Sequence, residues 1–148
     1  MSRALALHDV TYLELWEAMM AIEPAAAEYA ASRRTPAQLQ ALTRAGAQFK
    51  RDMTNTDSAV AAVVGFFTAV AAASGNQVLA LSQAPLNVLL VPALTQVIDG
   101  VPQARERIEA AQAKILEAIK LKKSENARNW MEKHIRDFKR GYELKRDR

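Results

Sequence analysis

The sequence has no cysteine, little glycine or proline, and only two histidines. The absence of cysteine excludes disulfides, thiolate metal sites and cysteine nucleophiles. Five glycines and five prolines in 148 residues are few, and the plentiful Ala, Leu, Glu, Lys and Arg favour helix over sheet. The length suits one domain with a single core. We expect a protein of the reducing cytoplasm.

Long apolar runs and catalytic motifs are also missing. The first residues lack the pattern of a signal peptide, and no apolar run reaches the roughly 18 residues of a membrane helix. We therefore expect no contact with a membrane. The sequence has no glycine-rich phosphate loop, no Gly-x-Ser-x-Gly elbow and no His-Glu-x-x-His motif. Because His8 and His134 are the only imidazoles, the sequence predicts a binding protein that is not an enzyme.

Basic residues are concentrated at the C-terminal end. The net charge is +4, and eleven of the twenty Lys and Arg residues lie between positions 120 and 148. The aromatic residues of this segment, Trp130 and Phe138, fall on the apolar stripe of the predicted last helix and not among its cations. A surface that stacks nucleic-acid bases needs aromatic and basic side chains on one face. We interpret the segment as a solvated helix face.

Local signals predict several helix boundaries. Thr35 followed by Pro36 is typical of a helix start, with Thr35 as the N-cap and Pro36 at the first helical position. Gly75 suits the end of one helix, and Asn76 suits the cap of the next. Between these boundaries, apolar residues recur with the helical period. The pattern therefore predicts an all-helical chain.

Three prolines fall inside segments that otherwise look helical. Proline removes a backbone donor and clashes with the preceding turn, so we expect Pro24 to stop or kink the first helix. Residues 78–98 are harder to assign, because 88–91 has the propensity of a buried strand. No partner strand is evident elsewhere. We predict a helix there, interrupted near Pro85 and Pro92.

Two polar residues lie on or beside predicted apolar stripes. Gln112 sits between Ile108 and Ile115, and His134 lies in the middle of the last stripe. Buried polar side chains need hydrogen-bond partners. One interpretation is that Gln112 bonds to His134 or to a backbone carbonyl, and the other is that both contact a ligand. A single imidazole is a poor metal shell, so we predict no metal.

In order and spacing, the sequence resembles the FCD domain, the effector-binding domain that follows the winged helix in FadR-type GntR regulators. The resemblance covers nearly the whole chain. It rests on YLELWE at 12–17, AIEPAAA at 21–27, Arg33, Thr35, Phe66, ASGN at 73–76, ILEAI at 115–119, Ala127, Met131 and HI at 134–135. It implies an all-α fold, an antiparallel bundle of six or seven helices. The domain is expected over residues 9–142, with flexible ends at 1–8 and 143–148.

The resemblance also bears on the ligand. Many members hold a divalent metal through one Asp and three His. The matching positions here are Val63, Phe67, Gln112 and His134, and only His134 is retained as a ligand. A family arginine that meets carboxylate effectors corresponds to Met19. These departures imply an apolar cavity wall, a small and largely apolar effector, and no cofactor. The expected ligand-binding residues are Met19, Val63, Phe67, Asn76, Gln112 and His134.

The resemblance suggests partners as well. No winged helix precedes Tyr12, so we expect DNA to be contacted only indirectly, through a separate winged-helix module. The leading hypothesis is an effector-sensing domain that forms a homodimer, or a heterodimer with a related regulator. The alternative is an interaction protein that heterodimerises with a full-length regulator without binding a ligand. Catalysis by His134 as a lone general base and direct DNA binding by the basic tail are further hypotheses.

Overall fold

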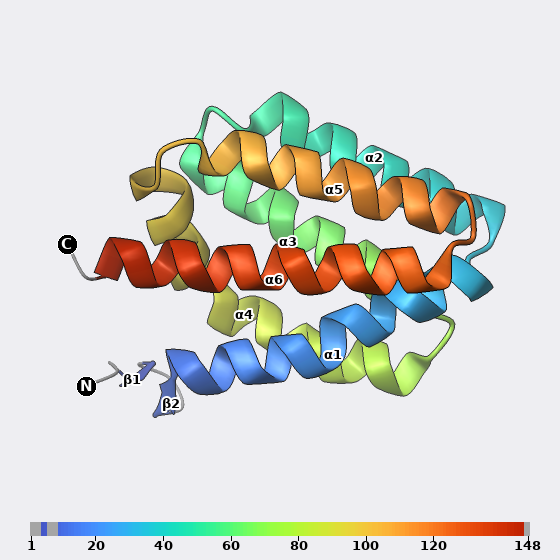
Figure 1. Cartoon of the computed structure of the whole chain (residues 1–148), viewed down its shortest axis with the longest axis horizontal. Helices are drawn as coiled ribbons and strands as arrows, with labels where there is room; N and C mark the ends of the chain where they lie inside the picture. Colours follow the sequence, from blue (N-terminus) through green and yellow to red (C-terminus); the bar gives the residue numbers. More distant parts are fainter. Residues whose placement is uncertain (1–3, 6–8, 147–148) are drawn as a thin grey trace.

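Six helices form an antiparallel bundle in the computed structural model, which describes residues 4–5 and 9–146 (Figure 1). A two-stranded antiparallel ladder of β1 (Ala4–Leu5) and β2 (Val10–Thr11) precedes them. The predicted fold class is confirmed. The helices are α1 (Tyr12–Arg33), α2 (Pro36–Asp52), α3 (Thr56–Ala73), α4 (Gln77–Gly100), α5 (Ala104–Lys120) and α6 (Ser124–Arg146).

The predicted helix starts at Thr35 and Asn76 are confirmed. Thr35 accepts the backbone N–H of Gln38 at 3.1 Å, and the Gln38 side chain accepts the Thr35 N–H at 2.9 Å. This reciprocal capping box satisfies two donors at the start of α2. Asn76 caps α4 by accepting the Leu79 N–H at 3.0 Å. Thr11 caps α1 in the same reciprocal way.

The interruptions expected near Pro85 and Pro92 are wrong, and Pro24 does not stop the first helix. α1 is continuous through Pro24, and α4 is continuous through Pro85 and Pro92. Pro24 is buried, and Ala26, Ala27, Ala30 and Ala31 after it have no exposed surface. A proline costs a helix one hydrogen bond and a clash, but burial along the length of the helix offsets that cost. Segment 78–98 is helical, as predicted.

α3 packs against α1, α2 and α4, while α1 and α6 run antiparallel beside each other (Figure 1). α1 packs mainly on α6, α2 on α3, and α5 on α6. The largest fully buried side chains come from every helix; they are Phe49, Phe66, Phe67, Phe138, Leu15, Met19, Leu42, Leu90, Leu94, Ile98, Ile115 and Ile119. One continuous core therefore links all six helices.

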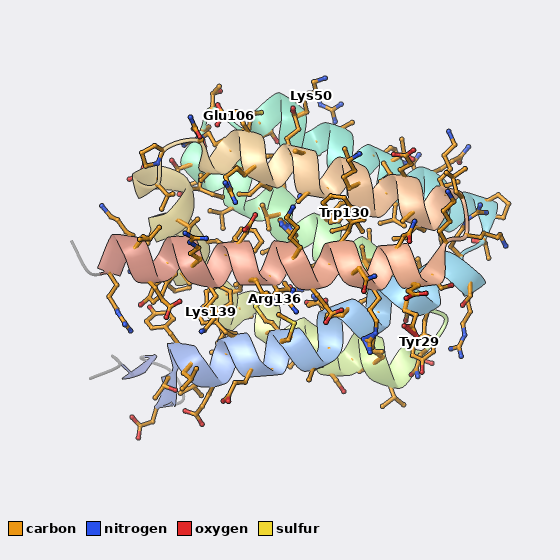
Figure 2. The ribbon with its side chains drawn as sticks, in the orientation of Figure 1. Tyr29, Lys50, Glu106, Trp130, Arg136 and Lys139 are labelled. Atoms are coloured by element: carbon orange, nitrogen blue, oxygen red, sulfur yellow. The ribbon has the colours of Figure 1, made fainter. Side chains whose placement is uncertain are left out.

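Trp130 lies at the edge of the core. Its place on the apolar stripe had suggested a position within the core. Its ring is partly buried, and the ammonium groups of Lys114 and Lys133 lie 5.7 and 5.0 Å from the ring centroid. Figure 2 shows Trp130 on α6 with Arg136 and Lys139 farther along the same helix. Cations above an indole face are attracted by its quadrupole. Trp130 therefore joins the apolar core to the charged surface.

α6 continues to Arg146, so residues 143–146 of the expected flexible end are helical. Ala4 and Leu5 of the other expected flexible end pair with β2. The remaining residues of both ends, 1–3, 6–8 and 147–148, lie outside the described residues. The domain limits 9–142 stay a prediction.

The corner between α4 and α5 is held by Arg105. Its guanidinium donates to the carbonyl of Ile98 at 2.8 Å, to Thr56 Oγ1 at 3.0 Å, and to the carbonyl of Met53. These bonds join the end of α4, the start of α3 and the end of α2. Gln103, which precedes α5, has a left-handed backbone with φ of 64°, a conformation that non-glycine residues adopt infrequently. The corner is therefore a fixed and mildly strained turn.

α3 and α4 are each long and apolar enough to cross a membrane, judged by length and composition alone. The sequence has no uninterrupted apolar run of membrane length, and the high mean hydropathy of these two helices was therefore not expected. α3 is packed between other helices of the bundle, which accounts for its apolar character. α4 leaves large apolar side chains in contact with solvent, with exposed fractions of 73% for Val78, 66% for Leu81 and 60% for Val88.

Candidate functional site

His134 lies in an aromatic cluster between α3 and α6. Its imidazole centroid is 6.0 Å from the ring of Phe67 and 4.5 Å from the ring of Phe138. Phe67 and Phe138 also contact each other at 6.3 Å. Val63 is buried one helical turn before Phe67. The structure thus brings together Phe67 and His134, two of the residues that the sequence singled out.

Three buried polar atoms on α5 and α6 are unpaired. Both amide atoms of Gln112 and the Nε2 atom of His134 are buried and have no hydrogen-bond partner among the described residues. The interpretation that Gln112 bonds to His134 or to a backbone carbonyl is therefore wrong. An unpaired buried polar group costs about 1–3 kcal/mol. These atoms could be satisfied by water or by a ligand.

The imidazole of His134 is held neutral. Burial lowers the pKa of His134 to about 4, and the nearby Asp137 carboxylate opposes that change. A neutral imidazole has one donor nitrogen and one acceptor nitrogen. His134 can therefore exchange one hydrogen bond of either sense with a ligand group, without contributing a charge.

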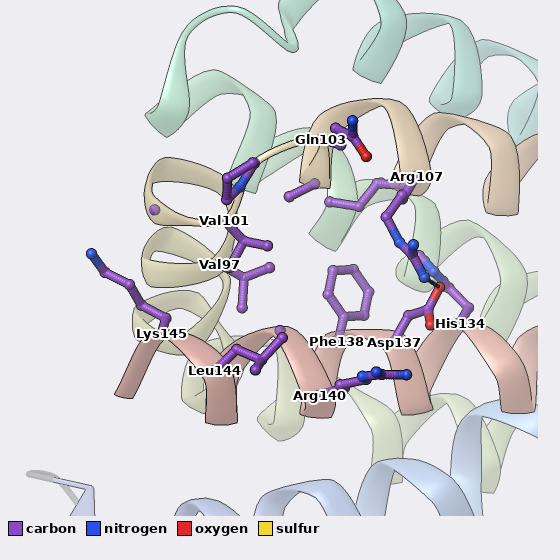
Figure 3. Close-up of a pocket in the computed structure, with 15 residues that line it drawn as sticks. Val97, Val101, Gln103, Arg107, His134, Asp137, Phe138, Arg140, Leu144 and Lys145 are labelled. Atoms are coloured by element: carbon purple, nitrogen blue, oxygen red, sulfur yellow. Dashed lines mark ion pairs between the residues drawn. The ribbon is translucent and has the colours of Figure 1, made fainter. Parts of the chain in front are cut away.

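A cavity of about 350 Å³ opens where α4 ends, α5 begins and the second half of α6 passes below them (Figure 3). We call it the side cavity. Its apolar wall is formed by Val97, Val101, Ile108 and Phe138, and His134 also lines it. Its charged lining residues are Arg107, Asp137, Arg140 and Lys145. Arg107 from α5 meets Asp137 from α6 in an ion pair of 2.9 Å.

The other predicted site residues do not line the side cavity. Met19 is completely buried on α1, and Val63 and Phe67 are completely buried on α3. Asn76 begins α4 at the end opposite the side cavity, about 35 Å away along the helix axis. Its side-chain oxygen is already occupied by the helix cap. His134 is the one residue of the six that reaches both the core and the side cavity.

A second buried polar cluster joins α1, α3 and α4. The Glu23 carboxyl is 1% exposed and accepts a hydrogen bond from Gln83 at 3.2 Å. Gln83 also exchanges hydrogen bonds with Asn87, which donates to Thr68 at 3.1 Å. Burial raises the pKa of Glu23 to about 8, against the opposing effect of the Gln83 bond. Glu23 within the apolar run AIEPAAA was the available signal, and our sequence reasoning missed it.

The donor set around His134 does not fit a divalent cation. Val63 and Phe67 offer hydrocarbon, and Gln112 offers a neutral amide. Within residues 4–5 and 9–146, no group of three or more His, Cys, Asp or Glu side chains is arranged to hold a metal ion. The chemistry available around His134 is therefore hydrogen bonding within apolar surroundings.

The comparisons agree with the observed fold. The FCD domain family matches residues 14–137. A solved structure of Streptococcus agalactiae GntR superimposes with a TM-score of 0.64 at 27% sequence identity, over 86% of this chain and 57% of that one. The chain thus spans a little over half the length of that protein. No curated protein matches the sequence.

These findings confirm the resemblance drawn from the sequence, together with the prediction of a regulatory and non-enzymatic domain. Five-sixths of the chain lies within the matched family region, and the bundle has the fold of the GntR relative. The chain belongs to the FCD domain family, the effector-binding regulatory domain of GntR-type transcription regulators.

Proposed function

We propose that this domain senses a small, largely apolar effector that contacts His134 and Gln112 in the bundle core. The observation that carries the proposal is the set of three unpaired polar atoms on these two buried residues. Folding has removed these atoms from water without giving them a partner, so a ligand that supplies one would gain the full hydrogen-bond energy. The same atoms make the empty core less stable than a liganded one.

The surrounding side chains define the effector's chemistry. Met19, Val63 and Phe67 supply an apolar wall without exposed surface. His134 is neutral because of its lowered pKa, and Gln112 is uncharged. The effector we propose therefore has an apolar body and one or two polar groups, and it binds without a metal or other cofactor. The side chain of Asn76 caps α4, and we leave it out of the proposed site.

Small molecules released from cell-purified protein by denaturation would test this proposal. Mass spectrometry should find a stoichiometric compound with the wild-type protein. It should be lost or strongly reduced in His134→Phe and Gln112→Met, and retained in the control Gln40→Met, whose exposed amide lies on α2. Far-ultraviolet circular dichroism checks that each variant is folded. A compound retained in both core variants would contradict the proposed contacts.

We further propose that the domain forms a homodimer through the outer face of α4. Exposed apolar residues recur there at helical spacing, at positions 78, 81, 85, 88 and 92. No charged residue occurs between 77 and 98. A continuous exposed apolar stripe of this kind is typical of an interaction surface, and a two-fold axis would place one stripe against its copy. Such a dimer would also explain why an apolar helix is so little buried in the single chain.

Light scattering of the purified protein would test the dimer. Val88→Lys places a charge in the middle of the stripe and should yield a folded monomer. Leu121→Lys makes the same change at another exposed apolar residue, in the turn after α5, and should leave the dimer intact. A wild-type protein that stays monomeric at high concentration would contradict this part of the proposal.

A second candidate function follows from the same stripe. A surface on α4 that fits its own copy would also fit a related regulator, so the chain could act by heterodimerising with a full-length regulator without a ligand. DNA would then be contacted through the partner's winged-helix module. Co-purification of such a regulator, together with a ligand-free core, would favour this candidate.

In the leading proposal, effector binding shifts the helix packing that sets the geometry of the dimer. The expected location of the protein is the cytoplasm.

A further inference from the structure

The carboxyl group of Glu23 is enclosed by uncharged surroundings. Its side chain is 1% exposed, and its Oε2 atom accepts a hydrogen bond from Gln83 at 3.2 Å. Its Oε1 atom has no partner among the described residues. A carboxylate that is removed from water needs a cation or several donors to stay ionised. Glu23 has one neutral donor, so the geometry favours the protonated carboxyl.

The two helices that share the polar cluster with Glu23 bring no cation to it. α3 and α4 carry one charged residue each, Asp57 and Asp99. Both lie at the end of the helix pair away from the cluster, where Thr56 donates to Asp99 at 3.1 Å. Along the helix axes they are about 16 and 24 Å from the cluster. Two distant carboxylates do not stabilise an ionised Glu23.

The other helices packed on α1 do not supply a cation either. Because α6 runs antiparallel to α1 and Arg128 pairs with Glu28 at 3.1 Å, Glu23 lies at the level of Glu132. Glu132 pairs with Arg136 on its own helix at 3.7 Å. α5 meets the end of α1, where Arg34 donates to two carbonyls of α5. The cations nearest to α1 are therefore already occupied.

A chain of hydrogen bonds leads from Glu23 to the molecular surface. Gln83 exchanges hydrogen bonds with Asn87 at 2.9 and 3.3 Å, and Asn87 donates to Thr68 at 3.1 Å. Gln83 is buried, Asn87 is half-buried and Thr68 is exposed. Thr68 and Asn87 are therefore the end of the cluster that water reaches.

A second copy packed on α4 would cover that end. Val88 follows Asn87 directly and is 60% exposed, and Val91 lies one turn after Asn87 and is 40% exposed. Packed helices lie about 8–10 Å apart, so side chains of the second copy would reach Asn87 and the neighbouring Thr68. Covering these residues removes more water from around Glu23. Loss of water disfavours the charged form of a carboxyl.

The protonation of Glu23 and dimerisation are then linked. Burial already raises the pKa of Glu23 to about 8, against the lowering effect of the Gln83 bond. A dimer that removes further water raises this pKa again, so the dimer holds the proton more tightly than the monomer. The state that holds a proton more tightly is favoured where the proton is bound. The dimer is therefore strongest below pH 8 and weakens as the pH rises through that value.

We propose that dimerisation through α4 is controlled by the protonation of Glu23: chains with a neutral carboxyl dimerise, and ionisation of the carboxyl favours the monomer. This inference rests on the proposed homodimer and names a proton as its regulator. Glu23 does not itself touch the second copy. It acts as a positioning residue through Gln83 and Asn87, which lie between it and the exposed face of α4.

Sedimentation equilibrium at pH 6, pH 7 and pH 9.5 measures the dissociation constant of the dimer. The wild-type value should change little between pH 6 and pH 7 and rise at least roughly fivefold by pH 9.5. Glu23→Gln keeps a neutral group of the same shape, so this rise should be absent. Glu17→Gln alters an exposed glutamate on the same helix and should keep the rise. Titration of lysine and tyrosine is common to all three proteins, and circular dichroism checks that each is folded.

The Glu23 carboxyl can also be followed directly. Carbon-13 nuclear magnetic resonance detects its carboxyl signal, which is identified by its absence in Glu23→Gln. A double variant, Leu81→Gln with Val88→Gln, removes exposed apolar side chains from α4 without adding charge and should be a folded monomer. The midpoint of the Glu23 titration should be higher in the wild-type dimer than in this monomer, by at least about 0.3 pH unit.

The outcomes are distinct. Equal midpoints in dimer and monomer, a wild-type dissociation constant that does not change with pH, or the same rise in Glu23→Gln would overturn the inference and leave the proposed homodimer intact. A wild-type protein that is monomeric at every pH, or a double variant that stays dimeric, would overturn the α4 homodimer and the inference together. The proposed effector fails on a separate result, the absence of any His134-dependent compound in cell-purified protein.

Discussion

The imidazole of His134 stacks on the ring of Phe67, with centroids 6.0 Å apart and an interplanar angle of 24°. This contact joins α6 to α3, and both side chains are buried. By the resemblance to the FCD domain, these two positions are metal ligands in many relatives. Here a hydrocarbon ring packs against the imidazole. One imidazole nitrogen has no partner among the described residues.

Gln112→Met should stabilise the protein in the absence of effector. Methionine has nearly the volume of glutamine, and the change removes two buried atoms that lack partners. Unpaired buried groups of this kind cost about 1–3 kcal/mol, so we expect the free energy of unfolding to rise by about 1–2 kcal/mol. Urea denaturation of the refolded, ligand-free protein measures this change in the free energy of unfolding.

Gln83→Met is the matched control for this prediction. Gln83 is also a buried glutamine, but its amide bonds to Glu23 and Asn87. The same substitution should lower the free energy of unfolding by about 1–3 kcal/mol, because it leaves the partners unpaired. Destabilisation of similar size in both variants would show that the Gln112 amide is satisfied in solution.

Acid should destabilise the domain through His134. Its pKa is lowered from 6.5 to about 4 in the folded state, so the folded protein binds a proton less readily than the unfolded chain. The stabilisation is complete above pH 6.5 and is lost as the pH falls toward 4. His134→Phe removes this dependence. Urea denaturation between pH 4 and pH 7 should therefore show a shallower decline in the variant, and identical slopes would contradict the lowered pKa.

Glu23 should act in the opposite direction. Its pKa is raised from 4.5 to about 8 in the folded state, so its stabilisation is complete below pH 4.5 and is lost as the pH rises through 8. Glu23→Gln keeps a neutral group of the same shape. The variant should be more stable than the wild-type protein at pH 8, by at least about 1 kcal/mol, and about equal to it at pH 4.5. If the difference in unfolding free energy between the wild-type protein and the variant were the same at both pH values, Glu23 would not be a buried neutral carboxyl.

Thr35→Ala should destabilise the bundle by about 1 kcal/mol, the usual cost of losing a helix N-cap. The Thr35 side chain accepts the Gln38 N–H at the start of α2. Thr43→Ala is the control, because Thr43 is exposed within the same helix and bonds only to the carbonyl one turn earlier. That change should stay within about 0.5 kcal/mol. Thermal unfolding followed by circular dichroism distinguishes the two, and equal effects would contradict the cap.

Features that depend on adjacent residues were predictable from the sequence. Thr35 and Pro36 specify a helix start by local chemistry, and the structure has that start. Asn76 is likewise an N-cap because its side chain reaches only three residues ahead. The prolines show where such local rules fail. Pro24 lies within a continuous α1 because tertiary burial outweighs local propensity, a balance that a single segment does not reveal.

The side cavity and the Glu23 cluster were not predictable in this way. Arg107 and Asp137 are thirty positions apart, and Glu23 and Gln83 are sixty apart. Their contacts depend on the register in which whole helices pack, and local periodicity does not determine that register. The core positions of Val63, Phe67 and His134 were found because each lies on a clear apolar stripe. Which of them borders a cavity depends on the α4–α5 corner, whose geometry is set by Arg105.

Native mass spectrometry of cell-purified protein tests the central claim most directly, because it reports oligomeric state and bound ligand together. The account predicts a dimer that carries one small molecule per chain, with the molecule lost in His134→Phe and the dimer lost in Val88→Lys. A wild-type spectrum containing only ligand-free monomer would contradict both the effector-sensing and the dimerisation proposals.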